Sequence, residues 1–233
     1  MNKSIKLISE TWVFYKSYFY GIFRVLAPVF LPLTLIDTLI IYWPPSSTIV
    51  LWSFLIAKLL VYPSYQGALI FYLGSIISGK TQTVSSCYEY AKLAYPKLLT
   101  VYCLYSLVVS AGFFLLIIPG LILASRLLIA DFMCVYDGKE GTEALNSSIE
   151  KTRSYQWTIL MGILVLAIFI GVPAITIEVL LKKINLLVFP TELILNIAIA
   201  FLTPLFTVFG FRIYTYQLSV ENRELGTPKW NHR

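Results

Sequence analysis

Five charged side chains lie inside long apolar stretches of this sequence, where charge is rare and often functional. They are Asp37, Lys58, Arg126, Asp131 and Glu178. Such residues could transfer protons between two carboxylates, form ion pairs, or bind an anionic group through Arg126 or Lys58. Proton transfer needs two carboxylates near one substrate, and nothing in the sequence places two of Asp37, Asp131 and Glu178 together. We therefore predict that the protein is not an enzyme.

Residues for other kinds of catalysis or for a metal site are scarce. The sequence contains no G-x-S-x-G motif, no phosphate-binding glycine loop and no H-E-x-x-H motif. The three cysteines, Cys87, Cys103 and Cys134, lie in or beside apolar segments, and the one histidine is His232. We expect the cysteines to be reduced and packed as small apolar residues. Neither a metal nor another cofactor is predicted.

The composition is that of a membrane protein. Of 233 residues, 58% are hydrophobic and 13% are charged, and the mean hydropathy is +0.78. A soluble domain with so few polar residues could not cover its surface with them, so lipid must cover it. The net charge is +6, but the basic residues lie between apolar stretches and form no long patch. Nucleic acid is therefore not an expected partner, whereas membrane lipids with anionic headgroups are.

The apolar run from Leu98 to Tyr136 determines how the chain is divided. As one straight helix it would be about 58 Å long, whereas the hydrocarbon core of a bilayer is roughly 30 Å thick. The run must therefore turn, and Pro119-Gly120 is the position that tolerates a turn best. We predict an all-α membrane protein with six transmembrane helices arranged as three hairpins, in a single domain of residues 1–233. The expected spans cover about residues 21–42, 49–78, 98–118, 120–136, 157–181 and 193–218.

Each expected hairpin is preceded by an amphipathic segment. These segments cover about residues 3–20, 83–95 and 142–155, and each has an apolar and a polar face at helical spacing. We expect them to lie as helices in the cytoplasmic interface of the membrane. The first is expected to be retained, because no signal-peptide cleavage site follows it. The order of segment and hairpin suggests a threefold pseudo-repeat, although aromatic and basic residues recur at any cytoplasmic interface.

The basic residues predict the orientation of these helices, because membrane proteins keep more Lys and Arg in their cytoplasmic loops. With the spans given above, only Lys182 and Lys183 fall on the side of the hairpin turns, and Lys58 and Arg126 fall within spans. Both termini are therefore predicted to be cytoplasmic. The residues on their side are Lys3, Lys6, Lys16, Arg24, Lys80, Lys92, Lys97, Lys139, Lys151, Arg153, Arg212, Arg223, Lys229 and Arg233.

Charged residues within the spans can be compared by their depth below the expected turns. At about 1.5 Å per residue, Asp37 and Arg126 lie about 9 Å deep, Glu178 about 5 Å and Lys58 about 13 Å. An unpaired charge at such a depth costs at least about 2.5 kcal/mol, so we favour ion pairs within the bundle, with Arg126 and Asp37 best matched in depth. The alternative is that Arg126 or Lys58 faces a lateral opening and binds a lipid phosphate.

A polar patch interrupts the second expected span, with the sequence Tyr62-Pro63-Ser64-Tyr65-Gln66-Gly67. It could be a broken helix that lines a cavity. We favour a proline kink with aromatic packing, because proline and glycine are common in transmembrane helices.

The segment from Ile117 to Trp157, IIPGLILASRLLIADFMCVYDGKEGTEALNSSIEKTRSYQW, resembles the central region of the YciC-like family of bacterial inner-membrane proteins. The shared pattern is a Pro-Gly turn, a span, an acidic loop and an A-L-x-x-S helix, which Ala144, Leu145 and Ser148 match. A weaker likeness extends to the opening helix and to FGFRIYTYQL. The resemblance implies a multi-pass protein of the bacterial inner membrane. Related membrane regions occur fused to glycerophosphodiester phosphodiesterase domains, which implies a lipid context by analogy.

Three classes of function are consistent with this sequence. The favoured one is a non-enzymatic protein of lipid handling or envelope organisation, with a cavity open to lipid or a docked membrane-protein partner. The second is a structural subunit of a membrane complex or a homo-oligomer. The third is a small transporter, which we place last because the six expected spans lack an evident inverted repeat.

Overall fold

The computed structural model describes residues 3–79, 82–186 and 188–225. Nearly all of these residues are helical, and no strand occurs among them. Lys80, Lys229, His232 and Arg233, which were considered above, lie outside the described residues. Six helices are long and apolar enough to cross a membrane, so the chain is a multi-pass membrane protein. They are Ile5–Tyr42, Thr48–Ile77, Val84–Leu115, Ile117–Asp137, Gly141–Lys183 and Phe189–Gln217.

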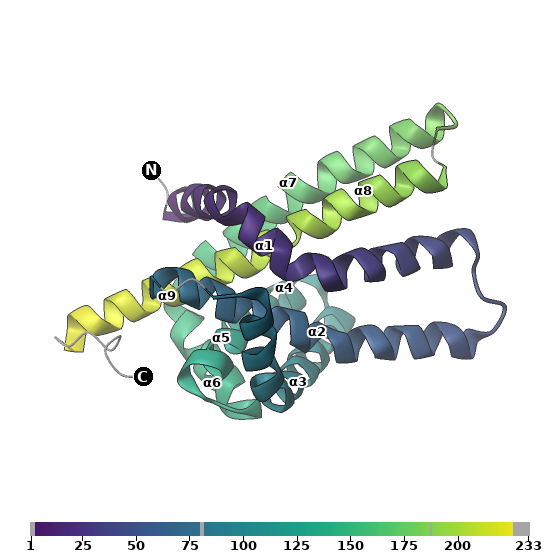
Figure 1. The fold of residues 1–233 in the computed structure, drawn as a ribbon. Coiled ribbons are helices and arrows are strands. Elements are labelled where there is room, and N and C mark those ends of the chain that lie inside the picture. The colour runs from purple at the N-terminus through teal and green to yellow at the C-terminus, as the bar shows by residue number, and fades with distance from the viewer. Residues whose placement is uncertain (1–2, 80–81, 187, 226–233) are drawn as a thin grey trace.

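The first two helices are α1, Lys3–Tyr42, and α2, Thr48–Ile77. The first amphipathic segment, 3–20, and the first span, 21–42, adjoin and belong to one continuous helix. Pro28 and Pro32 lie inside α1 without ending it. Figure 1 shows that α1 changes direction along its length, so that its first turns and its last turns point differently.

The third helix, α3, covers Val84–Leu115 and is followed directly by α4, Ile117–Leu127. The chain turns at Leu116, which has extended backbone angles of φ −163° and ψ 152°. The turn predicted at Pro119-Gly120 is therefore wrong by a few residues. Proline is readily accepted in the first turn of a helix, because the N–H group that it lacks would have no partner there.

Two glycines allow α3 and α4 to approach closely. A Cβ atom on Gly112 would lie 3.0 Å from the Cα of Gly120 and 2.7 Å from a methyl carbon of Leu123. A Cβ atom on Gly120 would lie 2.5 Å from the ring of Phe113. Small residues at such crossings let two helix backbones pack tightly in a membrane.

The fourth span is interrupted, in contrast to the prediction of one helix over residues 120–136. A turn at Leu128 and Ile129 separates α4 from α5, Ala130–Asp137. The break removes the helical partner of the Arg126 carbonyl. Two hydroxyl groups of α6, Gly141–Thr152, replace it: Ser148 Oγ donates to this carbonyl at 2.7 Å and Thr152 Oγ1 at 2.9 Å.

The chain continues through a short 3₁₀ helix, Arg153–Tyr155, to α7, Gln156–Lys183, and α8, Phe189–Leu202. The last helix, α9, covers Pro204–Leu225. The sixth predicted span is thus interrupted at Thr203, because Pro204 cannot continue the hydrogen bonding of α8 and instead begins a new helix. In Figure 1, α8 lies beside α7.

The packed core lies where the first half of α1 meets α9, rather than near the turns. The Tyr15 hydroxyl donates to the carbonyl of Phe201, and Arg212 Nη2 lies 2.7 Å from Glu10 Oε2. Large buried side chains gather there, including Phe132, Phe209, Phe211 and Tyr214. Two amphipathic segments contribute Tyr15 and Ala144 to this core, whereas Cys87 of the segment 83–95 is buried in a smaller cluster with Val25 and Ala68.

The helix ends near the turns expose many apolar side chains. Phe114 is 93% exposed and Ile118 is 71% exposed at the α3–α4 turn. Ile49, Trp52 and Ile175 are also exposed. Such surfaces are stable only in contact with lipid or another apolar partner.

Candidate functional site

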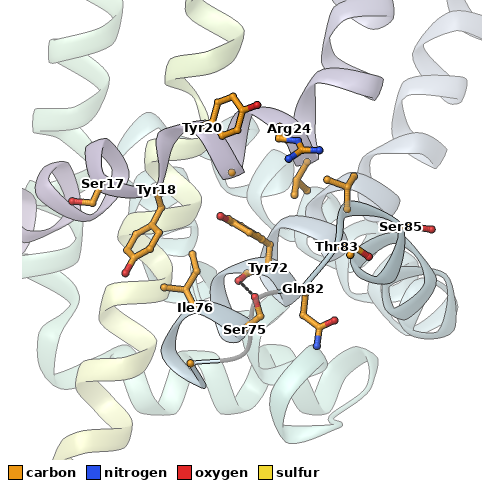
Figure 2. A pocket seen from close by; sticks show the side chains of 14 residues that line it. Ser17, Tyr18, Tyr20, Arg24, Tyr72, Ser75, Ile76, Gln82, Thr83 and Ser85 are labelled. Carbon is orange, nitrogen blue, oxygen red and sulfur yellow. Dashed lines mark hydrogen bonds between the residues drawn. The ribbon is translucent and has the colours of Figure 1, made fainter.

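A large pocket lies where α1 changes direction and meets the end of α2 and the start of α3. Its volume is about 870 Å³, within the range of small-molecule sites. Figure 2 shows the side chains that surround it. The polar side chains in its wall include those of Tyr18, Tyr20, Arg24, Tyr72, Gln82 and Thr83.

Two glycines shape this pocket. A Cβ atom on Gly21 would overlap the hydroxyl group of Tyr72, so glycine at this position lets the α2 side chain reach α1. Gly79 has φ +67°, a conformation that favours glycine, and it ends α2 with a change of direction toward α3. The walls of the pocket therefore depend on positions where a larger residue would be strained.

The charges in this pocket favour an anion. Among the described residues that line it, Arg24 is the only charged one, and none is a carboxylate. The Arg24 guanidinium lies 5.7 Å from the ring centroid of Tyr20, and no ion pair with Arg24 occurs within the described part of the chain. An arginine without an acidic partner is available to bind carboxylate or phosphate.

The start of α3 adds uncharged donors to the same wall. Thr83 is the N-cap of α3, and its hydroxyl oxygen accepts a hydrogen bond from the Ser86 N–H at 3.2 Å. Val84 and Ser85 line the pocket and occupy the first turn, where backbone N–H groups have no acceptor within the helix. Helix N-termini favour negative charge for this reason. Arg24 and the start of α3 thus both favour the binding of an anion in this pocket.

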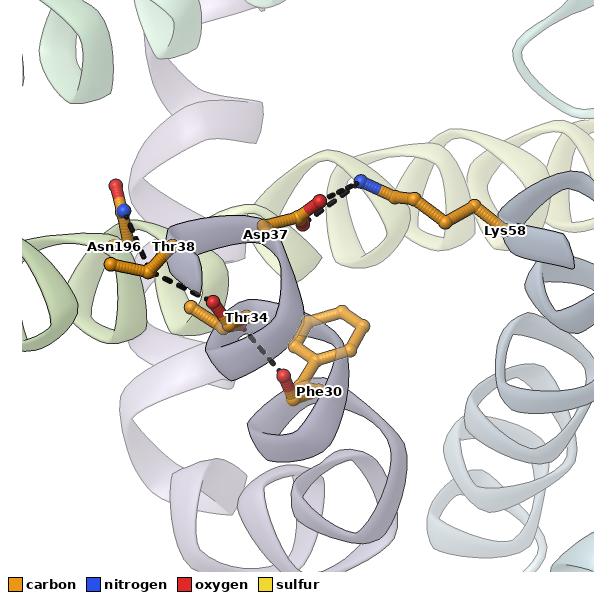
Figure 3. A network of polar contacts seen from close by, with 6 residues as sticks. All are labelled: Phe30, Thr34, Asp37, Thr38, Lys58 and Asn196. Carbon is orange, nitrogen blue, oxygen red and sulfur yellow. Dashed lines mark hydrogen bonds and ion pairs between the residues drawn. The ribbon is translucent and has the colours of Figure 1, made fainter. Parts of the chain in front are cut away.

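The charged residues that the sequence singled out lie elsewhere. Figure 3 shows that Asp37 pairs with Lys58, and the Lys58 Nζ lies 2.9 Å from both carboxylate oxygens. The predicted pair of Asp37 with Arg126 is therefore wrong. The depth of a residue in the membrane does not determine whether Arg126 or Lys58 is the partner of Asp37. The chain connects α1 directly to α2, and this connection brings Lys58 beside Asp37. The pair is partly exposed, at 37% for Asp37 and 38% for Lys58.

A row of hydroxyl groups accompanies this pair on α1. Thr34 Oγ1 donates to the Phe30 carbonyl at 2.7 Å, and Thr38 Oγ1 donates to the Thr34 carbonyl at 2.9 Å. Asn196 Nδ2 of α8 donates to Thr38 Oγ1 at 3.1 Å (Figure 3). Polar side chains inside the spans therefore link α1 to two helices: Asp37 to α2, and Thr38 to α8.

Arg126 is paired with an amide and not with an acid. Its Nε and Nη2 atoms donate to Gln156 Oε1 at 2.8 and 2.6 Å. A glutamine side chain carries no charge, so this contact orients the guanidinium without neutralising it. The alternative that Arg126 binds a lipid phosphate remains a prediction.

The two remaining acids have different surroundings. Glu178 accepts from Lys182, one turn later on α7, at 2.6 Å, and both side chains are exposed. Asp131 instead lines an internal cavity with Tyr62 and Gln66. The five residues thus form no single cluster.

The polar patch Tyr62–Gly67 does border this cavity, through Tyr62 and Gln66. It lies in an unbroken α2, which contains Pro63, so the alternative of a broken helix is wrong.

Arg24 was not predicted as a site residue from the sequence, where it is one of many basic residues on the side of the termini. A usable signal was present, since Tyr20, Gly21 and Arg24 combine an aromatic ring, a small residue and a base at the start of a span. Metal binding has no equivalent signal: no group of three or more Asp, Glu, His or Cys side chains that could hold a metal ion occurs in the described part of the chain.

A scan against protein-family models found no match, and searches of curated proteins and of solved structures found no significantly similar chain. The resemblance to the YciC-like family therefore stays a prediction based on the residues quoted for it. The function must be argued from the site.

Proposed function

We propose that this chain is a non-enzymatic membrane protein that binds the headgroup of an anionic phospholipid in the pocket between α1, α2 and α3. The observation that carries the proposal is Arg24, a base with no acidic partner among the described residues, in the wall of a pocket of about 870 Å³ beside the N-terminus of α3. The hydroxyl groups of Tyr18 and Tyr72 could bind the phosphate or glycerol oxygens. The exposed aromatic ring of Tyr20 would contact the acyl chains next to the headgroup.

The proposed orientation places this pocket in the cytoplasmic leaflet of a bacterial inner membrane. It follows the distribution of Lys and Arg along the sequence, with both termini cytoplasmic. The six helices would form three hairpins, and the amphipathic parts of α1, α3 and α6 would lie near the headgroups. Anionic lipids give that surface a negative potential, so Arg24 would meet its ligand there.

The experiment uses the full chain in nanodiscs that contain phosphatidylglycerol and phosphatidylcholine. Native mass spectrometry after mild delipidation counts the anionic lipids that stay bound. We expect Arg24→Gln to weaken retention of phosphatidylglycerol at least about tenfold, because a charge-assisted hydrogen bond is lost. Arg153→Gln is the matched control, since Arg153 is an exposed arginine on the same predicted side and outside this pocket.

A second variant fills the pocket but keeps the charge of Arg24, so it tests the need for space separately from the need for charge. Ser17 lines the pocket and is exposed, so Ser17→Trp should fill part of the pocket without disturbing the core. We expect it to lower lipid retention as well. Equal retention by the wild type and both pocket variants would exclude this site, and an equal loss in Arg153→Gln would reduce the effect to general surface charge.

A further inference from the structure

A second cavity lies between the helices of the bundle, apart from the pocket described above. Its volume is about 210 Å³, and residues of α2, α3, α4, α5, α7 and α9 line it. Among the described residues in its wall, Asp131 is the only charged one. Three tyrosines, Tyr62, Tyr102 and Tyr105, share the wall, and most of the remainder is apolar.

Asp131 has no base to neutralise it within the described part of the chain. The bases of the spans are engaged elsewhere: Lys58 and Lys182 pair with other acids, and Arg126 pairs with a glutamine amide. No hydrogen bond to the Asp131 carboxyl occurs among the described residues either. An acid kept in a membrane span without a partner is a candidate for binding a ligand of opposite charge.

Aromatic rings gather beside this carboxyl group. The rings of Tyr62 and Tyr102 stack with centroids 4.0 Å apart and an interplanar angle of 16°. The rings of Tyr102 and Tyr105 are nearly parallel, with centroids 6.5 Å apart. The Asp131 carboxyl group is close enough to interact electrostatically with the hydroxyl groups of all three tyrosines. Tyrosine rings attract cations to their faces, so the rings and the carboxylate favour the same charge.

Two other polar side chains of the cavity, Gln66 and Thr207, are hydrogen-bonded to each other. Gln66 is 8% exposed, and its Nε2 donates to Thr207 Oγ1 at 3.1 Å. Both residues also border a neighbouring cavity of about 220 Å³ on the side of α1. Their hydrogen bond links α2 to α9 and forms a common wall of the two cavities. Among the described residues of the wall, Asp131 and the three tyrosine hydroxyl groups are therefore left to meet a ligand, and Asp131 is the charged one.

We propose that this cavity binds a small organic ammonium ion, with Asp131 as its counter-ion and the stacked rings of Tyr62, Tyr102 and Tyr105 in the wall beside it. One carboxylate among aromatic and apolar side chains suits an ammonium ion, whereas a divalent metal needs several oxygen ligands. The volume limits the ligand to a small amine. The amine could be soluble or could belong to a lipid headgroup. This site does not depend on the proposed binding of anionic lipid at Arg24.

The test uses the full chain in nanodiscs of phosphatidylglycerol alone, which offer no amine. Thermal unfolding is followed while methylammonium or tetramethylammonium chloride replaces sodium chloride at constant ionic strength. We expect both cations to raise Tm in a saturable way, and the larger tetrabutylammonium to have no such effect. Repeating the titration with phosphatidylethanolamine in the nanodiscs distinguishes the two sources: a weaker response assigns the site to the lipid amine, and an unchanged one to a soluble amine.

Asp131→Asn should weaken the apparent affinity for methylammonium at least about tenfold, because the charge that attracts the cation is gone. Glu178→Gln is the control, since it removes a carboxylate of another span away from the cavity. Tyr102→Phe should keep the response and Tyr102→Leu should lower it, which tests the rings even if Asp131→Asn does not fold. The proposal is overturned if the wild type does not distinguish ammonium ions from sodium, or if Asp131→Asn, once folded, responds as the wild type does.

Discussion

The ion pair of Asp37 with Lys58 gives a prediction whose size follows from its place in the membrane. Asp37 lies about 9 Å along the helix axis from Trp43, which places it inside the hydrocarbon if the indole marks the interface. The Lys58 ammonium lies 2.9 Å from both carboxylate oxygens. Removing either charge leaves the other without its partner, at a cost of at least about 2.5 kcal/mol of unfolding free energy. We expect this loss for Asp37→Leu and for Lys58→Leu.

The double variant distinguishes an ion pair from two independent residues. With both residues replaced by leucine, no charge remains in the lipid, and the free energy of unfolding should change by less than about 1 kcal/mol. The coupling between the two sites is then roughly 4 kcal/mol. The exchange variant, Asp37→Lys with Lys58→Asp, should recover most of the stability that each single exchange removes.

Reversible unfolding of the chain by SDS in mixed micelles, followed by circular dichroism, measures these differences. Glu178→Gln serves as the reference, because its exposed contact with Lys182 on the same helix should contribute no more than about 0.5 kcal/mol. If the double leucine variant loses as much stability as the sum of the two single variants, the contact between Asp37 and Lys58 has no energetic role and the argument from depth is wrong.

Three further predictions test other contacts and the orientation. Gly112→Ala should destabilise the chain by about 1 to 3 kcal/mol in the same unfolding assay, because its Cβ would meet α4, whereas Gly171→Ala, with no atom within 4 Å, should not. Ser148→Ala should cost about 1 kcal/mol, because the carbonyl at the α4 break keeps one hydroxyl donor instead of two. In a cysteine-free background, Ser46→Cys should react with an impermeant thiol reagent applied from the periplasm, and Ser154→Cys should not; the reverse labelling would invert the predicted orientation.

The sequence predicted six helices apolar and long enough to cross a membrane, and the described residues contain six, because a long apolar run is a local property of the chain. The positions at which the helices break were harder to predict from the sequence. The turn at Leu116 lies before the Pro-Gly pair, since proline is well accepted in the first turn of α4. The break at Leu128 and Ile129 contains neither proline nor glycine. The Arg126 carbonyl beside it accepts from Ser148 and Thr152, which follow Arg126 by 22 and 26 residues.

The candidate sites were also only partly predictable from the sequence. Asp131 was recognised from the sequence because a charge in an apolar run is conspicuous, but its tyrosine neighbours come from other helices. Arg24 looked like one more basic residue at a span end, and only the approach of α2 and α3 gives it a pocket. The partner of Asp37 could not be chosen from depth, because depth does not report the direction in which a side chain leaves its helix.

The contacts that hold the first half of α1 join opposite ends of the chain. Tyr15 and Phe201 are 186 residues apart, and Glu10 and Arg212 are 202 residues apart. At about 5 to 20 residues per second, a ribosome takes roughly 10 to 40 s to synthesise the intervening chain. The first helix must therefore leave the ribosome and persist without its final neighbours while the other spans insert. A stop codon before α8 would leave it permanently in that state, so quality-control proteases could recognise an unfinished chain by its undocked N-terminus.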